Sequence, residues 1–287
     1  MTTPHSPTLR LRRLAAMLRR ARERAGYTTS QVGAKFKWSA GKVSKMETTE
    51  TKRISPNDLD RLMDLYGVTD QAEREGMQAL ARDARQRGWW SKYKKVFSDH
   101  ALPDFEAEAS LIRTFEAQIV PGLLQTPQYA EALLKGGRYT DPETVRQKVE
   151  ARMARRDILT RPEPARLRAV IDEAALRRPI GGTETLRGQL AHLLYMAQLP
   201  NIDVQVLPLD AGAHAALGAP FTLLDFPDPL DLPIVYIDTA GEGVFLEDPE
   251  EVEAHSATFG DIQGSALSTT RSAAVITDLL RAPESES

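Results

Sequence analysis

The spacing of apolar residues changes along the chain, and its first part has the period of helices. Apolar residues recur there at intervals of three and four, so that one face of each helix can pack on a core. The first such stretch spans residues 9–24, with arginines between the apolar positions. Those positions are Leu11, Leu14, Ala15, Leu18 and Ala21.

Four further short helices are expected before residue 88. Thr28 and Thr29 offer N-caps for a second helix, because a short side-chain oxygen there accepts a bond from a free backbone N–H. Ser39 is placed to cap a third helix, and Ser55 precedes a proline that opens a fourth. A fifth is expected over roughly 70–86. Five short helices predict a compact all-α domain.

The second part of the chain mixes helices with strands. After Pro164, short runs rich in β-branched residues and bounded by Gly, Pro and Asp predict strands. These runs are RLRAVID, IDVQVLP, FTLLDF, IVYID and GVFLED. Helical periods are expected over 104–117, 127–135, 141–159, 183–198, 249–262 and 268–281.

The predicted fold is therefore multidomain. An all-α N-terminal domain of five helices precedes an α+β C-terminal domain. We place the first domain at 1–88 and the second at 111–287, with a junction at 89–110.

The junction contains two of the three tryptophans. Trp89, Trp90 and Tyr93 either pack between the domains or form a patch for a partner, since aromatic side chains are enriched at binding hot spots. Packing is the simpler interpretation, and both stay open.

Charge is distributed unevenly over a chain whose net charge is only −3. Residues 1–100 hold 21 Lys and Arg against 11 Asp and Glu, a balance of +10. Residues 101–287 hold 16 against 29, a balance of −13. A basic N-terminal part joined to an acidic C-terminal part indicates one end that binds a polyanion and another with a different role.

Several kinds of chemistry have no signature in the sequence. There is no cysteine, which excludes disulfides, thiolate nucleophiles and cysteine-bound zinc. The five histidines include no HExxH motif and no pair at metal-ligand spacing on one helix. The glycine-containing stretch GGTETLRG matches neither the P-loop pattern nor the dinucleotide-binding pattern. We expect no catalytic site, no metal and no cofactor.

The stretch KFKWSAGKVSKMETT, residues 35–49, is unusually rich in small and basic residues for a helix. Val43 and Met46 are its inward anchors, and little else in it is apolar. Two short helices joined by a tight turn, the second rich in small and basic residues, are typical of a helix-turn-helix. The second helix of that motif enters the major groove of DNA, where lysine can donate to guanine O6 and N7.

The N-terminal sequence from LRRLAAMLRRARERAGYTTSQVG to MDLYGV resembles the XRE/Cro-type helix-turn-helix domain of phage repressors. Glu47 stands where that family has a carboxylate that pairs with an arginine of the first helix, here Arg22. The resemblance implies a structural role for this pair. It also assigns DNA contacts to Thr29, Ser39, Ala40, Gly41, Lys42, Ser44 and Lys45.

The chain departs from the family pattern at a few of these positions. Thr29 stands where the family often has glutamine, and Lys37 where the turn often has glycine. Ala40 and Gly41 have no side-chain donors at positions that often contact bases. Direct base contact is therefore expected to depend on Lys45, with Lys42 placed at phosphate.

The rest of the chain resembles a second known domain. The stretches GWWSKYKKVF, EAEASLIRTFEAQIVPGLLQTPQYAEALL and LPNIDVQVLPLDAGAHAALGAPFTLLDFP are similar to the C-terminal domain, of unknown function, in actinobacterial antitoxin-like XRE regulators. The resemblance implies a small partner protein encoded by a neighbouring gene.

We expect a sequence-specific DNA-binding transcription regulator rather than an enzyme. It is expected to bind double-stranded operator DNA as a homodimer, because one helix-turn-helix is too small to be specific alone. We expect the C-terminal domain to bind the small partner protein, and the alternative is that it senses a small-molecule ligand. Without an apolar run long enough to span a membrane, the protein is expected in the cytoplasm, at the nucleoid when bound to DNA.

Overall fold

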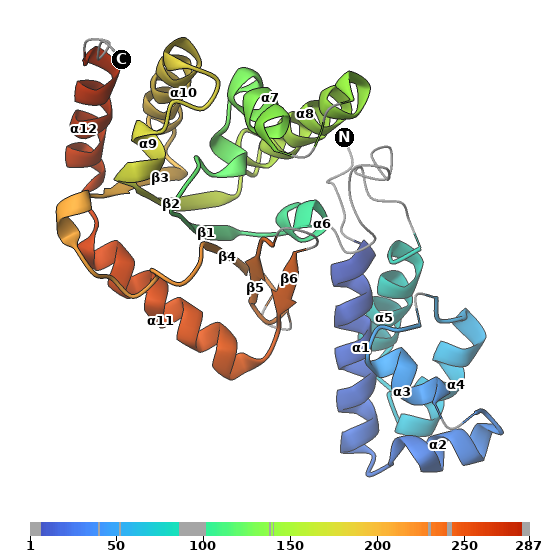
Figure 1. The fold of residues 1–287 in the computed structure, drawn as a ribbon. Helices are drawn as coiled ribbons and strands as arrows, with labels where there is room; N and C mark the ends of the chain where they lie inside the picture. Colours follow the sequence, from blue (N-terminus) through green and yellow to red (C-terminus); the bar gives the residue numbers. More distant parts are fainter. Residues whose placement is uncertain are drawn as a thin grey trace. The chain divides into compact units, whose positions relative to one another are not determined.

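The computed structural model describes residues 7–39, 41–51, 53–85, 102–137, 139, 141–228, 231–239 and 243–282. The chain forms two compact units, the first made mainly of Met1–Lys92 and the second mainly of Tyr93–Ser287. The regular elements described in the first unit are all helices, and the second contains a mixed sheet with helices, as predicted (Figure 1).

Five helices pack around one core in the first unit. Residues that share this core come from every helix and include Leu14, Leu18, Val32, Val43, Met46, Leu59, Met63 and Met77. The apolar periodicity of the sequence is thus the inner face of each helix. The helices are α1 (Pro7–Arg24), α2 (Thr29–Phe36), α3 (Lys42–Glu47), α4 (Pro56–Tyr66) and α5 (Gln71–Asp83).

Side-chain caps define where most of these helices begin. Thr28 caps α2 in a reciprocal box, in which its hydroxyl accepts from the Gln31 N–H and its own N–H donates to the Gln31 amide. Ser55 caps α4 ahead of Pro56. The predicted Ser39 cap is wrong: α3 begins only at Lys42, after a turn in which the Ser39 carbonyl accepts the Lys42 N–H at 3.0 Å.

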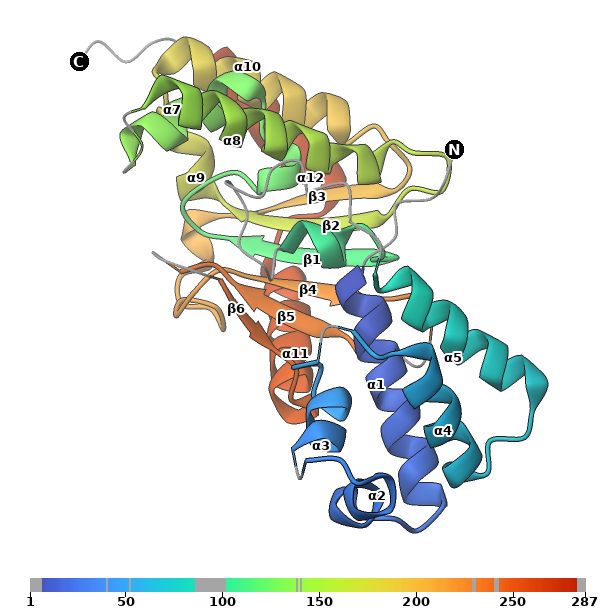
Figure 2. The same ribbon diagram turned by 90° about the vertical axis from the view of Figure 1, so that its right-hand side faces the viewer.

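A six-stranded sheet with strand order β3-β2-β1-β4-β5-β6 organises the second unit (Figure 2). β1, β2 and β3 are parallel to one another, whereas β1, β4, β5 and β6 pair antiparallel in succession. The strands are β1 (Leu111–Glu116), β2 (Arg166–Asp172), β3 (Ile202–Leu207), β4 (Phe221–Asp225), β5 (Ile234–Ile237) and β6 (Val244–Leu246).

Helices cover both faces of this sheet. α7 and α8 lie on one face and α11 on the other, while α12 packs along β3 and α10 packs on α12 (Figure 1). Short 3₁₀ turns occur at Gly122–Leu124, Arg156–Leu159 and Leu209–Ala211. The helices are α6 (Leu102–Glu106), α7 (Pro127–Gly136), α8 (Pro142–Arg155), α9 (Glu173–Arg177), α10 (Thr183–Met196), α11 (Pro249–Ser265) and α12 (Thr269–Arg281).

The helix predicted over 104–117 is wrong, because most of that stretch is a central strand. Only the short α6 is helical there, and β1 follows it. Ile112 and Phe115 are spaced by three residues as in a helix, yet each is buried on a different face of the sheet. Pairing with β2 and β4 on both sides overrides the local helical period.

The alternation along β1 separates two environments. Arg113 points toward α11, where it forms a bidentate ion pair with Asp225 at 3.0 Å and donates to Ser256 at 2.8 Å. Phe115 belongs to the apolar core on that face. Thr114 and Glu116 line a cavity on the opposite face, beneath α8.

Candidate functional site

The α2–α3 turn holds a non-glycine residue in a conformation that glycine favours. Lys37 ends α2 with φ 55° and ψ 40°, in the left-handed region. Its neighbour Trp38 donates a backbone bond to the Gly33 carbonyl at 2.9 Å, which closes the end of the helix. This is the position at which the sequence departs from the usual glycine, and the backbone geometry is nevertheless of the glycine type.

α3 is anchored on one side and open on the other. Val43 and Met46 are buried in the domain core. Gly41, Ser44 and Lys45 are exposed on the outer side. Within the described ranges, no side chain forms a hydrogen bond or ion pair with Lys45. A Cβ on Gly41 would meet only the end of the Lys45 side chain, so the backbone at the start of α3 is open to close approach.

Lys42 is already engaged within the domain. Its ammonium lies 2.8 Å from Asp58 of α4 and 3.9 Å from the centre of the Trp38 ring. Arg61 lies over the same ring, 5.5 Å from its centre, and 4.5 Å from the centre of Phe36. The sequence analysis missed this cluster of cations and aromatic rings. The only sequence signal for it was two aromatic residues at the turn.

The remaining DNA-contact positions differ in how the structure places them. Thr29 is half-buried at the first position of α2, and Ser39 is exposed in the turn. Ala40 lies outside the described residues, as do the junction residues Trp89, Trp90 and Tyr93.

Arg22 and Glu47 form a bidentate ion pair between α1 and the end of α3. Arg22 Nε lies 2.7 Å from Glu47 Oε1, and Arg22 Nη2 lies 2.9 Å from Oε2. Arg22 also donates to the Tyr27 carbonyl at 2.6 Å. Both side chains are largely buried, with 12% and 6% of their surface exposed. The hydrogen bonds that Arg22 donates to Glu47 raise the pKa of Arg22.

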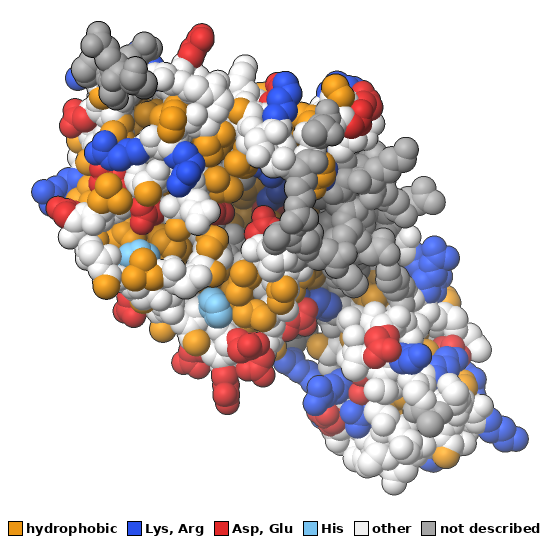
Figure 3. All heavy atoms as spheres, viewed as in Figure 1, with side chains coloured by type: hydrophobic (Ala, Val, Ile, Leu, Met, Phe, Trp, Pro, Cys, Tyr) orange, Lys and Arg blue, Asp and Glu red, His pale blue; other side chains and the backbone are white. Residues whose placement is uncertain are grey.

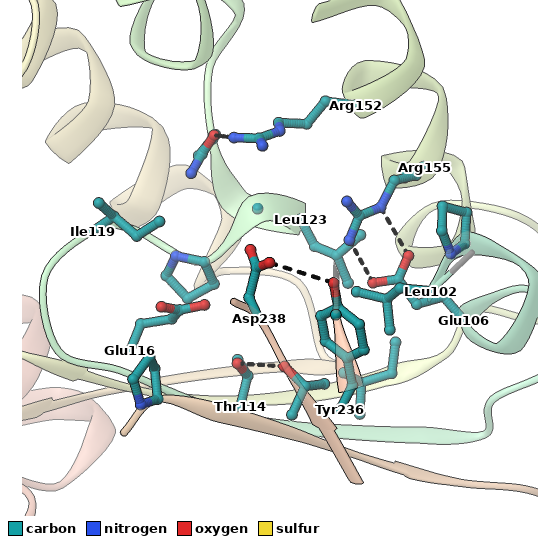
Figure 4. A pocket seen from close by; sticks show the side chains of 18 of the residues that line it. Leu102, Glu106, Thr114, Glu116, Ile119, Leu123, Arg152, Arg155, Tyr236 and Asp238 are labelled. Atoms are coloured by element: carbon teal, nitrogen blue, oxygen red, sulfur yellow. Dashed lines mark hydrogen bonds and ion pairs between the residues drawn. The ribbon is translucent and has the colours of Figure 1, made fainter. Parts of the chain in front are cut away.

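The second unit contains a cavity of about 760 Å³ between α8 and the sheet (Figure 4). Arg152 and Arg155 enter it from α8, and Glu116 from the end of β1. Tyr236 and Asp238 enter it from β5 and the residues that follow. Apolar side chains that line the cavity include Leu102, Ile112, Ile119, Leu123 and Leu134.

The two arginines of the cavity have different partners. Arg155 forms a buried bidentate pair with Glu106 of α6, at 2.8 and 2.7 Å. Arg152 donates to the side-chain oxygen of the buried Gln125. No Asp or Glu in the described part of the chain forms an ion pair with Arg152. Burial and the neighbouring Arg155 lower the pKa of Arg152 to about 10.

Two groups on the acidic side of the cavity, Glu116 and Tyr236, have raised pKa values. Burial raises the pKa of Glu116 to about 7, and the nearby Asp238 charge adds to the shift. The Tyr236 hydroxyl lies 3.5 Å from Asp238, and burial raises the pKa of Tyr236 to about 12. Sequence analysis had singled out none of these groups.

Acidic side chains also mark the surface of the second unit. They gather over the start of α11 in Figure 3, where Glu250, Glu251 and Glu253 are exposed. Among the described residues there is no cluster of three or more potential metal ligands. None of the described helices has the length and apolar content needed to cross a bilayer.

Comparison with known families identifies both units. A model described as a helix-turn-helix domain matches residues 13–77, which cover most of α1, all of α2 to α4 and the first part of α5. A model described as a domain of unknown function, DUF5753, matches residues 100–278. Curated proteins and solved structures gave no match. The helix-turn-helix domain makes this protein a DNA-binding regulator, and the match over more than half of the chain shows that it belongs to the DUF5753 family.

Proposed function

We propose that this protein is a sequence-specific transcription regulator that inserts α3 into the major groove of double-stranded operator DNA. The observation that carries the proposal is the outer face of α3. Exposed Gly41 and Ser44 let the helix approach the base edges, and Lys45 extends beside them without a partner in the described part of the chain. An unpaired ammonium on a small-residue helix suits donation to guanine O6 and N7.

The other contact residues have supporting roles in this proposal. Thr29 and Ser39 donate to phosphates on either side of α3, and the family resemblance assigns Ala40 to the base edges. Lys42 binds phosphate only after it leaves Asp58, which holds it at 2.8 Å in the free protein. Its contribution to DNA affinity is therefore the difference in free energy between its pair with phosphate and its pair with Asp58. We expect this contribution to be smaller than that of Lys45.

Dimerisation is part of the proposal because α3 is short. Six helical residues contact few base pairs, and two such helices on half-sites one helical turn apart multiply the discrimination. The acidic surface over α11 favours a role for the second unit away from DNA, since phosphate repels carboxylates.

Two modes of control remain for the C-terminal unit. The antitoxin-like resemblance supports binding of a small protein from a neighbouring gene, for which Trp89, Trp90 and Tyr93 are candidate contacts. The cavity beneath α8 supports the alternative, a small-molecule ligand. We favour the second, because Arg152, Glu116 and Asp238 line the cavity and none of them forms an ion pair among the described residues. The proposal assigns no catalytic role and places the protein in the cytoplasm.

Footprinting on DNA upstream of the protein's own gene tests the proposal. Wild type should protect two adjacent lobes, and Lys45→Ala should lose the protection at the same concentration. Arg19→Ala is the matched control, because it also removes one exposed positive charge but from α1. Equal loss in both variants would show that Lys45 acts only through net charge.

A further inference from the structure

The cavity beneath α8 has walls of opposite charge. Lys148, Arg152 and Arg155 follow one another at intervals of four and three residues, so that one face of α8 presents three cations to the cavity. Glu116 and Asp238 approach from the sheet side, and Figure 4 shows both carboxylates directed toward the space below Arg152. A ligand there meets a basic wall and an acidic wall together.

The fold neutralises only part of this charge. Glu106 accepts hydrogen bonds from two nitrogens of the Arg155 guanidinium, as in an ion pair that stabilises the fold. Arg152 has only the neutral amide of Gln125 as a partner among the described residues. A guanidinium held in a cavity without an ion-pair partner is arranged for an anion that arrives with the ligand.

The two carboxylates of the acidic wall also lack an ion-pair partner among the described residues. Glu116 and Asp238 repel each other, and neither forms an ion pair within the described residues. Burial and, as a smaller contribution, the repulsion from Asp238 raise the pKa of the Glu116 carboxyl to about 7. An ammonium group placed between them would remove the repulsion and satisfy both carboxylates.

Size and apolar lining restrict the ligand further. The volume of about 760 Å³ lies in the usual range for small-molecule sites. Ile112, Leu123 and Leu134 add apolar surface to the lining of the cavity. We propose that this cavity binds a short zwitterionic peptide with apolar side chains, with its carboxylate on Arg152 and its ammonium between Glu116 and Asp238.

Binding in this cavity does not depend on the DNA-binding proposal. The two can therefore fail separately, because one is measured with DNA and the other with peptide alone.

Calorimetric titration of the full chain with L-leucyl-L-leucine is the direct test. The matched probes are N-acetyl-L-leucyl-L-leucine, which lacks the ammonium, and L-leucyl-L-leucine amide, which lacks the carboxylate. We expect saturable binding of the free dipeptide and affinities at least about tenfold lower for each blocked form, the effect of losing one charged contact.

Variants assign each end of the peptide to its wall. Arg152→Gln should lower the affinity for the free dipeptide about tenfold, because the peptide carboxylate has lost its partner. This variant should then bind the free dipeptide no more tightly than the amide. Glu116→Gln should likewise remove the preference for the free dipeptide over the acetylated form. Arg146→Gln is the control on the outer face of α8, where Arg146 pairs with Glu143 and Glu150, and it should bind as wild type.

Two results would overturn the proposal. One is the absence of saturable binding by any of the three probes up to about 10 mM. The other is equal affinity for blocked and free forms, which would show that the charged walls do not select the ligand. Thermal unfolding of each variant verifies that a loss of binding is not a loss of fold.

Discussion

Removal of the Glu47 carboxylate should release α3 from the rest of the helix-turn-helix domain. α3 has only six residues and no side-chain cap at its start, and helices of that length do not form by themselves in water. Val43 and Met46 anchor it in the core, and the Arg22–Glu47 pair anchors its last turn. Glu47→Ala therefore removes the polar attachment of the last turn of α3, while Lys42 at the start of the helix still pairs with Asp58.

The magnitude follows from the burial of the pair. Breaking a buried ion pair costs about 3–5 kcal/mol, because the remaining charge stays buried without its partner. Arg22 keeps its bond to the Tyr27 carbonyl, and Glu23 lies 3.5 Å from its guanidinium. We therefore expect the lower end, about 3 kcal/mol. Such a loss is a large fraction of the stability of a small domain.

Hydrogen-exchange mass spectrometry is the suitable assay, because it reports on α3 separately within the full chain. Glu47→Ala should increase exchange most in peptides that cover residues 42–47, and DNA affinity should fall with it. The double variant Arg22→Met/Glu47→Leu should recover most of the protection, since it leaves no buried charge. A loss below about 1 kcal/mol in Glu47→Ala, or a double variant as unstable as the sum of its singles, would refute the reasoning.

Three further predictions concern charges in the two units. Lys42→Ala should weaken binding to all DNA sequences alike and reduce the salt slope by about one, and unchanged salt dependence would contradict a phosphate contact. Since its folded pKa of about 7 exceeds the ordinary 4.5, Glu116 should lower stability as pH rises from about 4.5 to 7, by at most about 3 kcal/mol. Urea unfolding should show this decline in wild type but not in Glu116→Gln, and equal declines would assign it to another group. Arg155→Gln should lower the free energy of unfolding by about 3–5 kcal/mol, because it leaves Glu106 buried and unpaired. In the same urea assay, Arg152→Gln should lower it by less than about 1 kcal/mol. Similar losses in both variants would contradict the distinction between the two arginines.

The helices of the first unit could be predicted because local signals agree there. Apolar residues at helical spacing mark the inner faces, and Thr28 and Ser55 fix two of the starts. The pattern failed at β1, whose partners lie far away in the sequence. Ile112 and Phe115 are buried on opposite faces of the sheet, and only the pairing with β2 and β4 distinguishes this from a helix.

The site was predictable only where its residues lie close together in sequence. The outer face of α3 follows from one short stretch, and Arg22 and Glu47 were paired by family resemblance. The cavity has no such signal, because Glu116, Arg152 and Asp238 come from three separate elements. Arg152 lies in the same helix as Arg146, which pairs with Glu143 and Glu150 on the surface, and the sequence gives no reason to treat the two arginines differently.

Selection of bound sequences from a random double-stranded DNA pool tests the central claim most directly, because it needs no knowledge of the operator. The account predicts an enriched motif of two half-sites with centres about 10 base pairs apart. The same selection with Lys45→Ala should lose the preference at one base pair in each half-site and keep the rest. No enriched motif with wild type, or an unchanged motif with Lys45→Ala, would contradict the claim that α3 recognises DNA sequence through Lys45.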